Sequence, residues 1–354
     1  HCIRNAVYTQ NIPLEQHYHV SKKVRIPSTQ VAIGMCVVEL DRPWLETPFL
    51  FQGFIVSSEA DLAAVRKYCQ HVFIDTDRSR TAASDKSQAT QAPESAKGGL
   101  FKLFQRTPPT VPTHSIEQER AAALKTHSQT SALVKDFMDE VRLGRALDVK
   151  ALEQGVDDTV ESILRNPDAM SWLAQLRKKN ALHEQHAMNC CILAIVFGRH
   201  LGLPKEELKK LGLCALLHDI GMLKVPEETL QKVEPLTAAD MEQINQHTFY
   251  GRDLLMTIKD LYFGAVDVAN THHEWINGDG HPRGLDGSQI SPFTRIVSIV
   301  DTYDDILTEH SYRKARTPFE ALKAVHEARS NQLDEGLTKH FIDMIGVFPV
   351  GSMV

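Results

Sequence analysis

The sequence has no run of about eighteen apolar residues, so a membrane-spanning helix is not expected. Its first twenty residues are polar, and no apolar segment of the kind found in secretory signals is visible there. Only six of the 354 residues are cysteine and none forms a Cys-x-x-Cys pair, which predicts buried free thiols in a reducing compartment. These absences together favour a cytoplasmic protein.

The chain also has no excess of basic residues. Lys and Arg total 39 against 45 Asp and Glu, and the formal net charge is −6. A protein that binds polymeric nucleic acid needs a basic face, so neither DNA nor RNA is an expected partner. A local basic pocket for a small anionic ligand remains compatible with this balance.

Composition divides the chain into three parts. Residues 20–78 hold short β-branched and aromatic runs around one helical segment, which predicts a small α+β module. Residues 79–115 are rich in Ser, Thr, Ala, Gln and Pro, which is typical of a flexible linker. Across residues 116–354 apolar residues recur at helical spacing, which predicts an all-α bundle. The expected fold class is therefore mainly α.

The individual elements follow from these patterns. In the first part we expect strands at Val24–Ile26, Met35–Leu40, Phe49–Val56 and Val72–Ile74, and a helix at Ser58–Gln70. In the last part we expect helices at Thr130–Val141, Val149–Ile163, His183–His200, Lys205–Leu217, Thr237–Met256, Phe263–Thr271, Phe293–Thr308 and Pro318–Arg329, and a final helix within Gly336–Val354.

The 17 histidines carry the chemical information. His218 and Asp219 follow directly on an apolar helical run, where a buried carboxylate is costly unless it is paired or bound to a metal ion. Five imidazoles and two carboxylates lie on or beside such runs: His186, His218, Asp219, His247, His272, His273 and Asp301. Mixed nitrogen and oxygen donors suit Fe, Mn or Zn, and no thiolate is offered. Seven donors exceed the needs of one tetrahedral ion and fit two octahedral ions with a bridging hydroxide, a centre suited to phosphoester hydrolysis.

Between Ala181 and Ala324 the chain resembles the HD-GYP subgroup of the HD phosphohydrolase superfamily. The resemblance is carried by the LLHDIG run that ends at Gly221, the HHEWINGDGHPRGL run from His272 and the IVDTYDDILTEHSYRKA run from Ile299. It implies a hydrolase of cyclic di-GMP, the bacterial second messenger that regulates biofilm formation and motility. Residues 22–77, through their GMCVVELDRPW and VFIDTD runs, resemble the uncharacterised domain often found ahead of HD-GYP domains.

The resemblance also implies how the donors are shared. One divalent ion, iron or manganese, would be held by His186, His218, Asp219 and Asp301, and a second by His247, His272 and His273, with Asp219 as the bridging and catalytic carboxylate. Some members carry a Glu that binds a third metal, but Leu182 stands at that position, so a third ion is not expected.

The residues expected to grip phosphate depart from the family pattern. Met222 replaces a Lys, Trp275 an Arg, His281 the Tyr of the Gly-Tyr-Pro motif and His310 a basic residue. The candidate phosphate contacts that remain are Lys224, His281, His310, Arg313 and Lys314. His281 has two interpretations: a packing residue of its loop, or a titrating donor to the phosphate.

Three hypotheses follow. The leading one is a cyclic di-GMP phosphodiesterase. The second is a hydrolase of the same fold that acts on another cyclic dinucleotide or nucleotide, because the phosphate contacts are altered. The third is a metal-stabilised receptor or scaffold without catalysis, since metal binding also contributes to folding. A protein partner or a second copy of the chain is expected to bind, if at all, through the N-terminal module.

Overall fold

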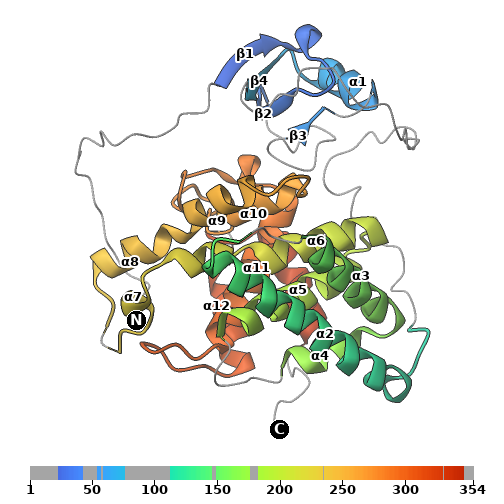
Figure 1. The fold of residues 1–354 in the computed structure, drawn as a ribbon, viewed down its shortest axis with the longest axis vertical. Helices are drawn as coiled ribbons and strands as arrows, with labels where there is room; N and C mark the ends of the chain where they lie inside the picture. The colour runs from blue at the N-terminus through green and yellow to red at the C-terminus, as the bar shows by residue number, and fades with distance from the viewer. Residues whose placement is uncertain are drawn as a thin grey trace.

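The computed structural model describes residues 23–42, 54–56, 59–75, 112–145, 149–175, 182–233, 235–329 and 331–346. The predicted linker 79–115 lies outside these ranges except at its last four residues. The fold is mainly α with a small sheet near the N-terminus, as predicted (Figure 1). Among the described residues, no helix is both long and apolar enough to cross a membrane.

The sheet is antiparallel, with strand order β1-β4-β2-β3. Its elements are β1 (Lys23–Pro27), β2 (Cys36–Leu40), β3 (Phe54–Ile55), α1 (Glu59–Tyr68) and β4 (His71–Asp75). The four strands and the helix fall where the sequence predicted them, although residues 49–53 of the third strand lie outside the described part. Val37, Val65 and Val72 are buried in a core of their own, because α1 covers one face of the sheet.

The helical domain has a single apolar core. Its elements in chain order are α2 (Ile116–Arg142), α3 (Val149–Arg165), α4 (Pro167–Ala174), α5 (Leu182–His200), α6 (Lys205–Leu217), η4 (Ile220–Lys224), α7 (Glu227–Leu230), α8 (Ala238–Asn245), α9 (His247–Met256), α10 (Phe263–Thr271), η5 (Gly287–Gln289), α11 (Pro292–Leu307), α12 (Pro318–Ala328) and α13 (Glu335–Ile345). Helix α5 runs through the middle of this domain, with α6 and α11 packed against it (Figure 1). Its polar residues can therefore lie beside those of two neighbouring helices.

Helix α2 begins fourteen residues before the predicted start at Thr130, so that prediction was wrong. Ser115 caps the helix: its side chain accepts from the Gln118 amide, and the Gln118 side chain accepts from the Ser115 amide. The first turns present few large apolar residues, so apolar spacing did not reveal them. The buried Glu119 side chain fixes these turns against α3, because Nε of Arg165 lies 2.8 Å from Oε2 of Glu119.

One short helix was missed and one long helix was predicted where the structure has two. Helix α4 was missed, because eight residues are too few for a clear helical period. Asn166 caps this helix and Pro167 is its first residue. The expected single helix Thr237–Met256 is two helices, α8 and α9. At the break the Nδ1 atom of His247 lies 2.7 Å from the carbonyl oxygen of Ile244, which thereby gains a side-chain donor. His247 consequently stands at the first turn of α9 and faces the core.

Candidate metal centre

The seven predicted donors come from five segments whose ends meet inside the helical domain. His186 lies on α5, His218 and Asp219 follow α6, His247 opens α9, His272 and His273 follow α10, and Asp301 lies on α11. The close approach of two of these segments depends on a glycine. A Cβ atom on Gly221 would stand 1.9 Å from the carbonyl oxygen of His247, so only glycine lets η4 pack this tightly on α9.

Three side chains form a first group around Asp301. The Oδ1 atom of Asp301 lies 3.2 Å from Nε2 of His186 and 3.5 Å from Nε2 of His218. All three residues are buried, and His218 is fully so. Among the described residues Nε2 of His218 has no hydrogen-bond partner, which is unusual for a buried polar atom in a well-packed domain.

A second group surrounds the other side of Asp219. Its Oδ1 atom lies 3.3 Å from Nε2 of His247 and 3.3 Å from Nε2 of His272. These two nitrogens are only 3.2 Å apart. The His273 ring completes the group, with its centroid 4.1 Å from that of His272 and 5.0 Å from that of His247.

Asp219 joins the two groups through its two oxygens. While Oδ1 faces His247 and His272, Oδ2 lies 3.6 Å from Nε2 of His186 and 3.8 Å from Nε2 of His218. One carboxylate thus presents one oxygen to each group. This is the arrangement expected of a carboxylate that bridges two cations.

Main-chain carbonyl oxygens fix the orientation of three of the imidazoles. Nδ1 of His218, His247 and His272 lies 2.8, 2.7 and 3.1 Å from the carbonyl oxygens of Ala215, Ile244 and Val268. A carbonyl only accepts, so Nδ1 carries a proton and donates, and Nε2 faces the site. Imidazole nitrogens and carboxylate oxygens therefore converge in two groups, and such a set of donors fits bound cations.

Electrostatics favours the ionised carboxylates: burial opposes protonation of His218, but Asp219 and Asp301 outweigh it and raise the pKa of His218. Burial opposes ionisation of Asp219, but the imidazoles of His218, His272 and His247 outweigh it and hold the pKa of Asp219 well below its usual value. Burial likewise opposes ionisation of Asp301, and His186 and His218 hold the pKa of Asp301 well below its usual value. Burial together with the neighbouring His272 and His247 holds the pKa of His273 well below its usual value. Both carboxylates are charged and His273 is neutral near pH 7.

Sequence reasoning missed two residues of this site. Asp304 is fully buried; its Oδ2 atom accepts from Nδ1 of His186 at 2.8 Å and its Oδ1 atom from Nδ2 of Asn189 at 3.2 Å. The signal was present, because Asp301 and Asp304 are one helical turn apart, as are His186 and Asn189. The sulfur of Cys190, which sequence reasoning did not assign to the site, lies 3.7 Å from Nε2 of His186 and within the first group.

Cys190 is not poised as a thiolate. Burial raises the pKa of its thiol to about 12, although His186 acts in the opposite direction. The predicted buried and free state is seen for the cysteines of the described part, namely Cys36, Cys69, Cys190, Cys191 and Cys214.

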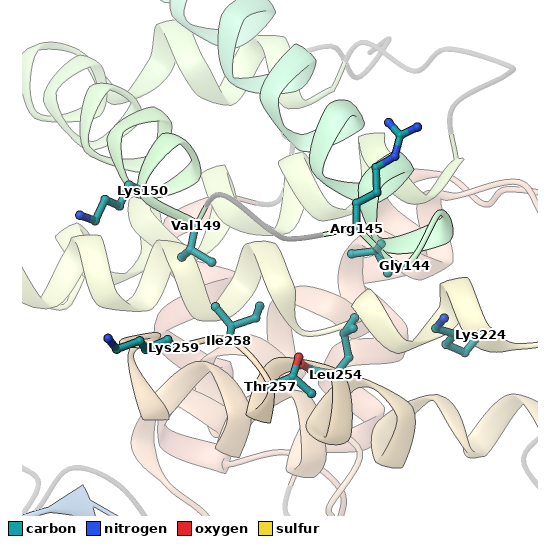
Figure 2. Close-up of a pocket in the computed structure, with 10 residues that line it drawn as sticks. Gly144, Arg145, Val149, Lys150, Lys224, Leu254, Thr257, Ile258 and Lys259 are labelled. Atoms are coloured by element: carbon teal, nitrogen blue, oxygen red, sulfur yellow. The ribbon is translucent and has the colours of Figure 1, made fainter.

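The candidate phosphate contacts are scattered. The ring of His281 lies beside that of His273, with centroids 4.9 Å apart, and its buried Nδ1 atom has no hydrogen-bond partner within the part of the chain that the structure describes. Nε2 of His310 and a guanidinium nitrogen of Arg313 each lie 2.8 Å from a carboxylate oxygen of Asp305. Lys314 is exposed. Lys224 lines a cavity that none of the seven donors lines (Figure 2). The structure therefore brings together the seven donors and His281, but not all five predicted contacts.

Comparisons with known proteins match two regions of the chain to known families. Residues 168–337 match a family model described as HD domain, and residues 23–152 match one described as a domain of unknown function, DUF3391. A cyclic di-GMP phosphodiesterase of Pseudomonas aeruginosa is 33% identical over 336 residues, which cover 93% of this chain and 78% of that protein. A 3'3'-cGAMP-specific phosphodiesterase of Vibrio cholerae is 34% identical over 154 residues, which cover 42% of this chain and 35% of that protein.

A solved structure shares the fold. An HD-GYP-type protein of Bdellovibrio bacteriovorus superposes with a TM-score of 0.55 at 17% identity, covering 92% of this chain and 99% of that one. At this identity the likeness extends to the fold alone.

Proposed function

Because the chain belongs to the HD-GYP family of metal-dependent phosphodiesterases, we propose that it hydrolyses cyclic di-GMP at the site around Asp219. The observation that carries the proposal is the position of Asp219, which turns one oxygen toward His186 and His218 and the other toward His247 and His272.

The donors fit two divalent ions. His186, His218 and Asp301 would hold one, and His247, His272 and His273 the other, with Asp219 shared between them. Imidazole and carboxylate donors favour iron or manganese over softer metals. When bound, such a pair of ions supplies a hydroxide nucleophile at neutral pH and neutralises charge on the phosphate oxygens.

The chain's own contribution is to hold the donors in one protonation state and orientation. Asp304 and the three main-chain carbonyls keep the proton on Nδ1 of their histidines, so each Nε2 faces the site. Asp219 stays ionised throughout the physiological range because its neighbours lower its pKa. The site is thus assembled before substrate arrives, which avoids reorganisation during the reaction.

His281 is the best supported candidate for contact with the substrate. It lies next to His273, and its buried Nδ1 atom has no partner among the described residues. We infer that this nitrogen binds a phosphate oxygen or a base edge of the substrate, in place of the tyrosine of the family motif. Contacts of His310, Arg313 and Lys314 with the substrate stay predictions. His310 and Arg313 are already paired with Asp305.

The test is turnover of cyclic di-GMP by protein purified without oxygen and loaded separately with Fe(II) and Mn(II). Asp219→Asn should abolish metal-dependent product, while Asp253→Asn, which alters an exposed carboxylate of α9, should not. A folded protein with about two bound ions and no product in either metal would refute the phosphodiesterase and favour a receptor.

A second candidate is a different cyclic dinucleotide. It is favoured by the similarity to the Vibrio cholerae protein named for 3'3'-cGAMP, and by His281 in a position next to the donors. Competition between cyclic di-GMP and 3'3'-cGAMP in one reaction measures the ratio of kcat/KM values and decides between them. The N-terminal module stays the proposed surface for a protein partner.

A further inference from the structure

A tight turn follows α11 and carries Tyr312 at its tip. The main chains of His310 and Arg313 pair across this turn: the amide nitrogen of His310 lies 2.8 Å from the carbonyl oxygen of Arg313, and the reverse bond measures 3.2 Å. Ser311 and Tyr312 therefore form the tip. The Ser311 hydroxyl donates to the carbonyl oxygen of Leu230 at 2.8 Å, at the last residue of α7. The tip is thus attached to the short helix that follows η4, on the segment that leaves the metal centre.

The Tyr312 side chain is oriented by its neighbours. Its ring stacks on that of His310, with centroids 5.2 Å apart and planes inclined by 23°. Burial raises the pKa of Tyr312, and the charges of Asp305 and Asp219 act in the same direction. Arg313 opposes them without cancelling the rise. The phenol therefore keeps its proton near pH 7, and it lies close enough to the metal centre to interact with the charge of the bridging carboxylate.

The charged side chains of the same turn are directed elsewhere. Nε2 of His310 and a guanidinium nitrogen of Arg313 each lie 2.8 Å from a carboxylate oxygen of Asp305. The Arg313 guanidinium also donates to the main-chain oxygen of Asp305 at 2.6 Å. Of the two hydroxyls at the tip, that of Ser311 is bound to a main-chain oxygen. The hydroxyl of Tyr312 is therefore the group of this turn that is best placed to reach a ligand of the metal centre.

We propose that the Tyr312 hydroxyl donates a hydrogen bond to a non-bridging phosphate oxygen of the substrate at the metal centre. The inference rests on the proposed function, because it requires a phosphate group beside Asp219. A hydrogen bond to an anionic oxygen is stronger than one between two neutral groups. A neutral donor also suits this position, since a cationic side chain so close to two divalent ions would be repelled by them.

The variant that tests this contact is Tyr312→Phe, which removes the hydroxyl and keeps the ring that stacks on His310. Tyr250→Phe, which alters an exposed tyrosine of α9, is the matched control. The full chain and both variants are loaded with Mn(II), and metal content and thermal melting are compared. Each is then titrated calorimetrically with inorganic phosphate, a measurement that needs no turnover.

Turnover is measured with two substrates. Cyclic di-GMP carries nucleobases, whereas bis(p-nitrophenyl) phosphate offers a phosphodiester without them. A contact with the phosphate should act on both substrates, and a contact with a base should act on cyclic di-GMP alone. The two substrates therefore distinguish a phosphate contact of Tyr312 from stacking or hydrogen bonding with guanine.

Tyr312→Phe should weaken phosphate binding by about tenfold or more, the scale of a hydrogen bond to a charged group. It should lower kcat/KM for both substrates by a similar factor, while the control behaves like the unaltered chain. Unchanged phosphate binding in Tyr312→Phe, no phosphate binding by the unaltered chain, or a loss confined to cyclic di-GMP would each overturn the proposal. If the unaltered chain binds phosphate but does not hydrolyse cyclic di-GMP, the proposed function fails, and the calorimetric comparison still decides the phosphate contact.

Discussion

Asp304 offers the sharpest test of how this site is built. Its buried carboxylate accepts from Nδ1 of His186 and from the amide of Asn189. Asp304→Asn keeps the shape of the side chain but removes the charge that fixes the His186 proton. The Oδ1 atom of Asn189, which has no hydrogen-bond partner among the residues that the structure describes, can accept from the introduced amide, so the variant should fold. Its effect should therefore appear in metal binding rather than in stability.

The magnitude follows from the role of such carboxylates behind metal-bound histidines. Their loss typically weakens metal affinity or activity by about 10-fold to 100-fold. Metal affinity is measured by competition with a chromogenic chelator, and kcat by product formation at saturating metal. Asp305→Asn is the control, because that neighbouring carboxylate is partly exposed and pairs with His310 and Arg313. If Asp304→Asn binds manganese and iron as tightly as the unaltered chain, the argument that Asp304 positions His186 is refuted.

Three further perturbations have distinct expected outcomes. Gly221→Ala should destabilise the fold by about 3 kcal/mol or more and weaken metal binding, since its Cβ would overlap the His247 carbonyl; Gly336→Ala, which meets an ordinary contact, should not, and urea unfolding measures both. Glu274→Gln should cost about 1.5–3 kcal/mol, because the buried carboxylate accepts two backbone amides of the loop that follows it; unchanged unfolding would contradict this. Burial raises the pKa of Asp267 to about 7, so its neutral form is favoured in the folded state, and this stabilisation is lost as pH rises through 7. The free energy of unfolding should therefore decline by about 2.7 kcal/mol between pH 5 and 8, and Asp267→Asn should remove this decline.

The helices could be predicted where one buried face gives apolar residues at regular helical spacing. Val149–Arg165 and Pro292–Leu307 carry apolar residues at helical spacing, and their predicted bounds agree with the structure within about two residues. Helix α8 contains no buried residue, so its apolar pattern could not show that it ends before His247. The break depends on a side-chain contact with a main-chain carbonyl, which spacing does not encode.

The metal-donor residues could be predicted from the sequence because each is a polar residue within or beside an apolar run. Asp301 follows eight mostly apolar residues of α11, and His218 and Asp219 end an apolar helix, so their polarity demanded a partner. Asp304 contradicts its surroundings as strongly, but the next residue, Asp305, is partly exposed, and sequence alone does not say which of the two faces inward. Only the packing of α11 against α5 selects Asp304.

Contacts with the substrate were the least predictable part, and Lys224 shows why. In sequence it lies five residues after Asp219, close enough to suggest a phosphate ligand of the same site. In the structure Ile220–Lys224 is a 3-10 helix, whose tighter winding sets the direction of each side chain differently from an α-helix. Asp219 faces the imidazoles while Lys224 lines the cavity bordered by Leu254 and Ile258. Proximity in sequence suggested one site for both residues, whereas the local backbone geometry turns Lys224 toward a cavity that none of the seven donors lines.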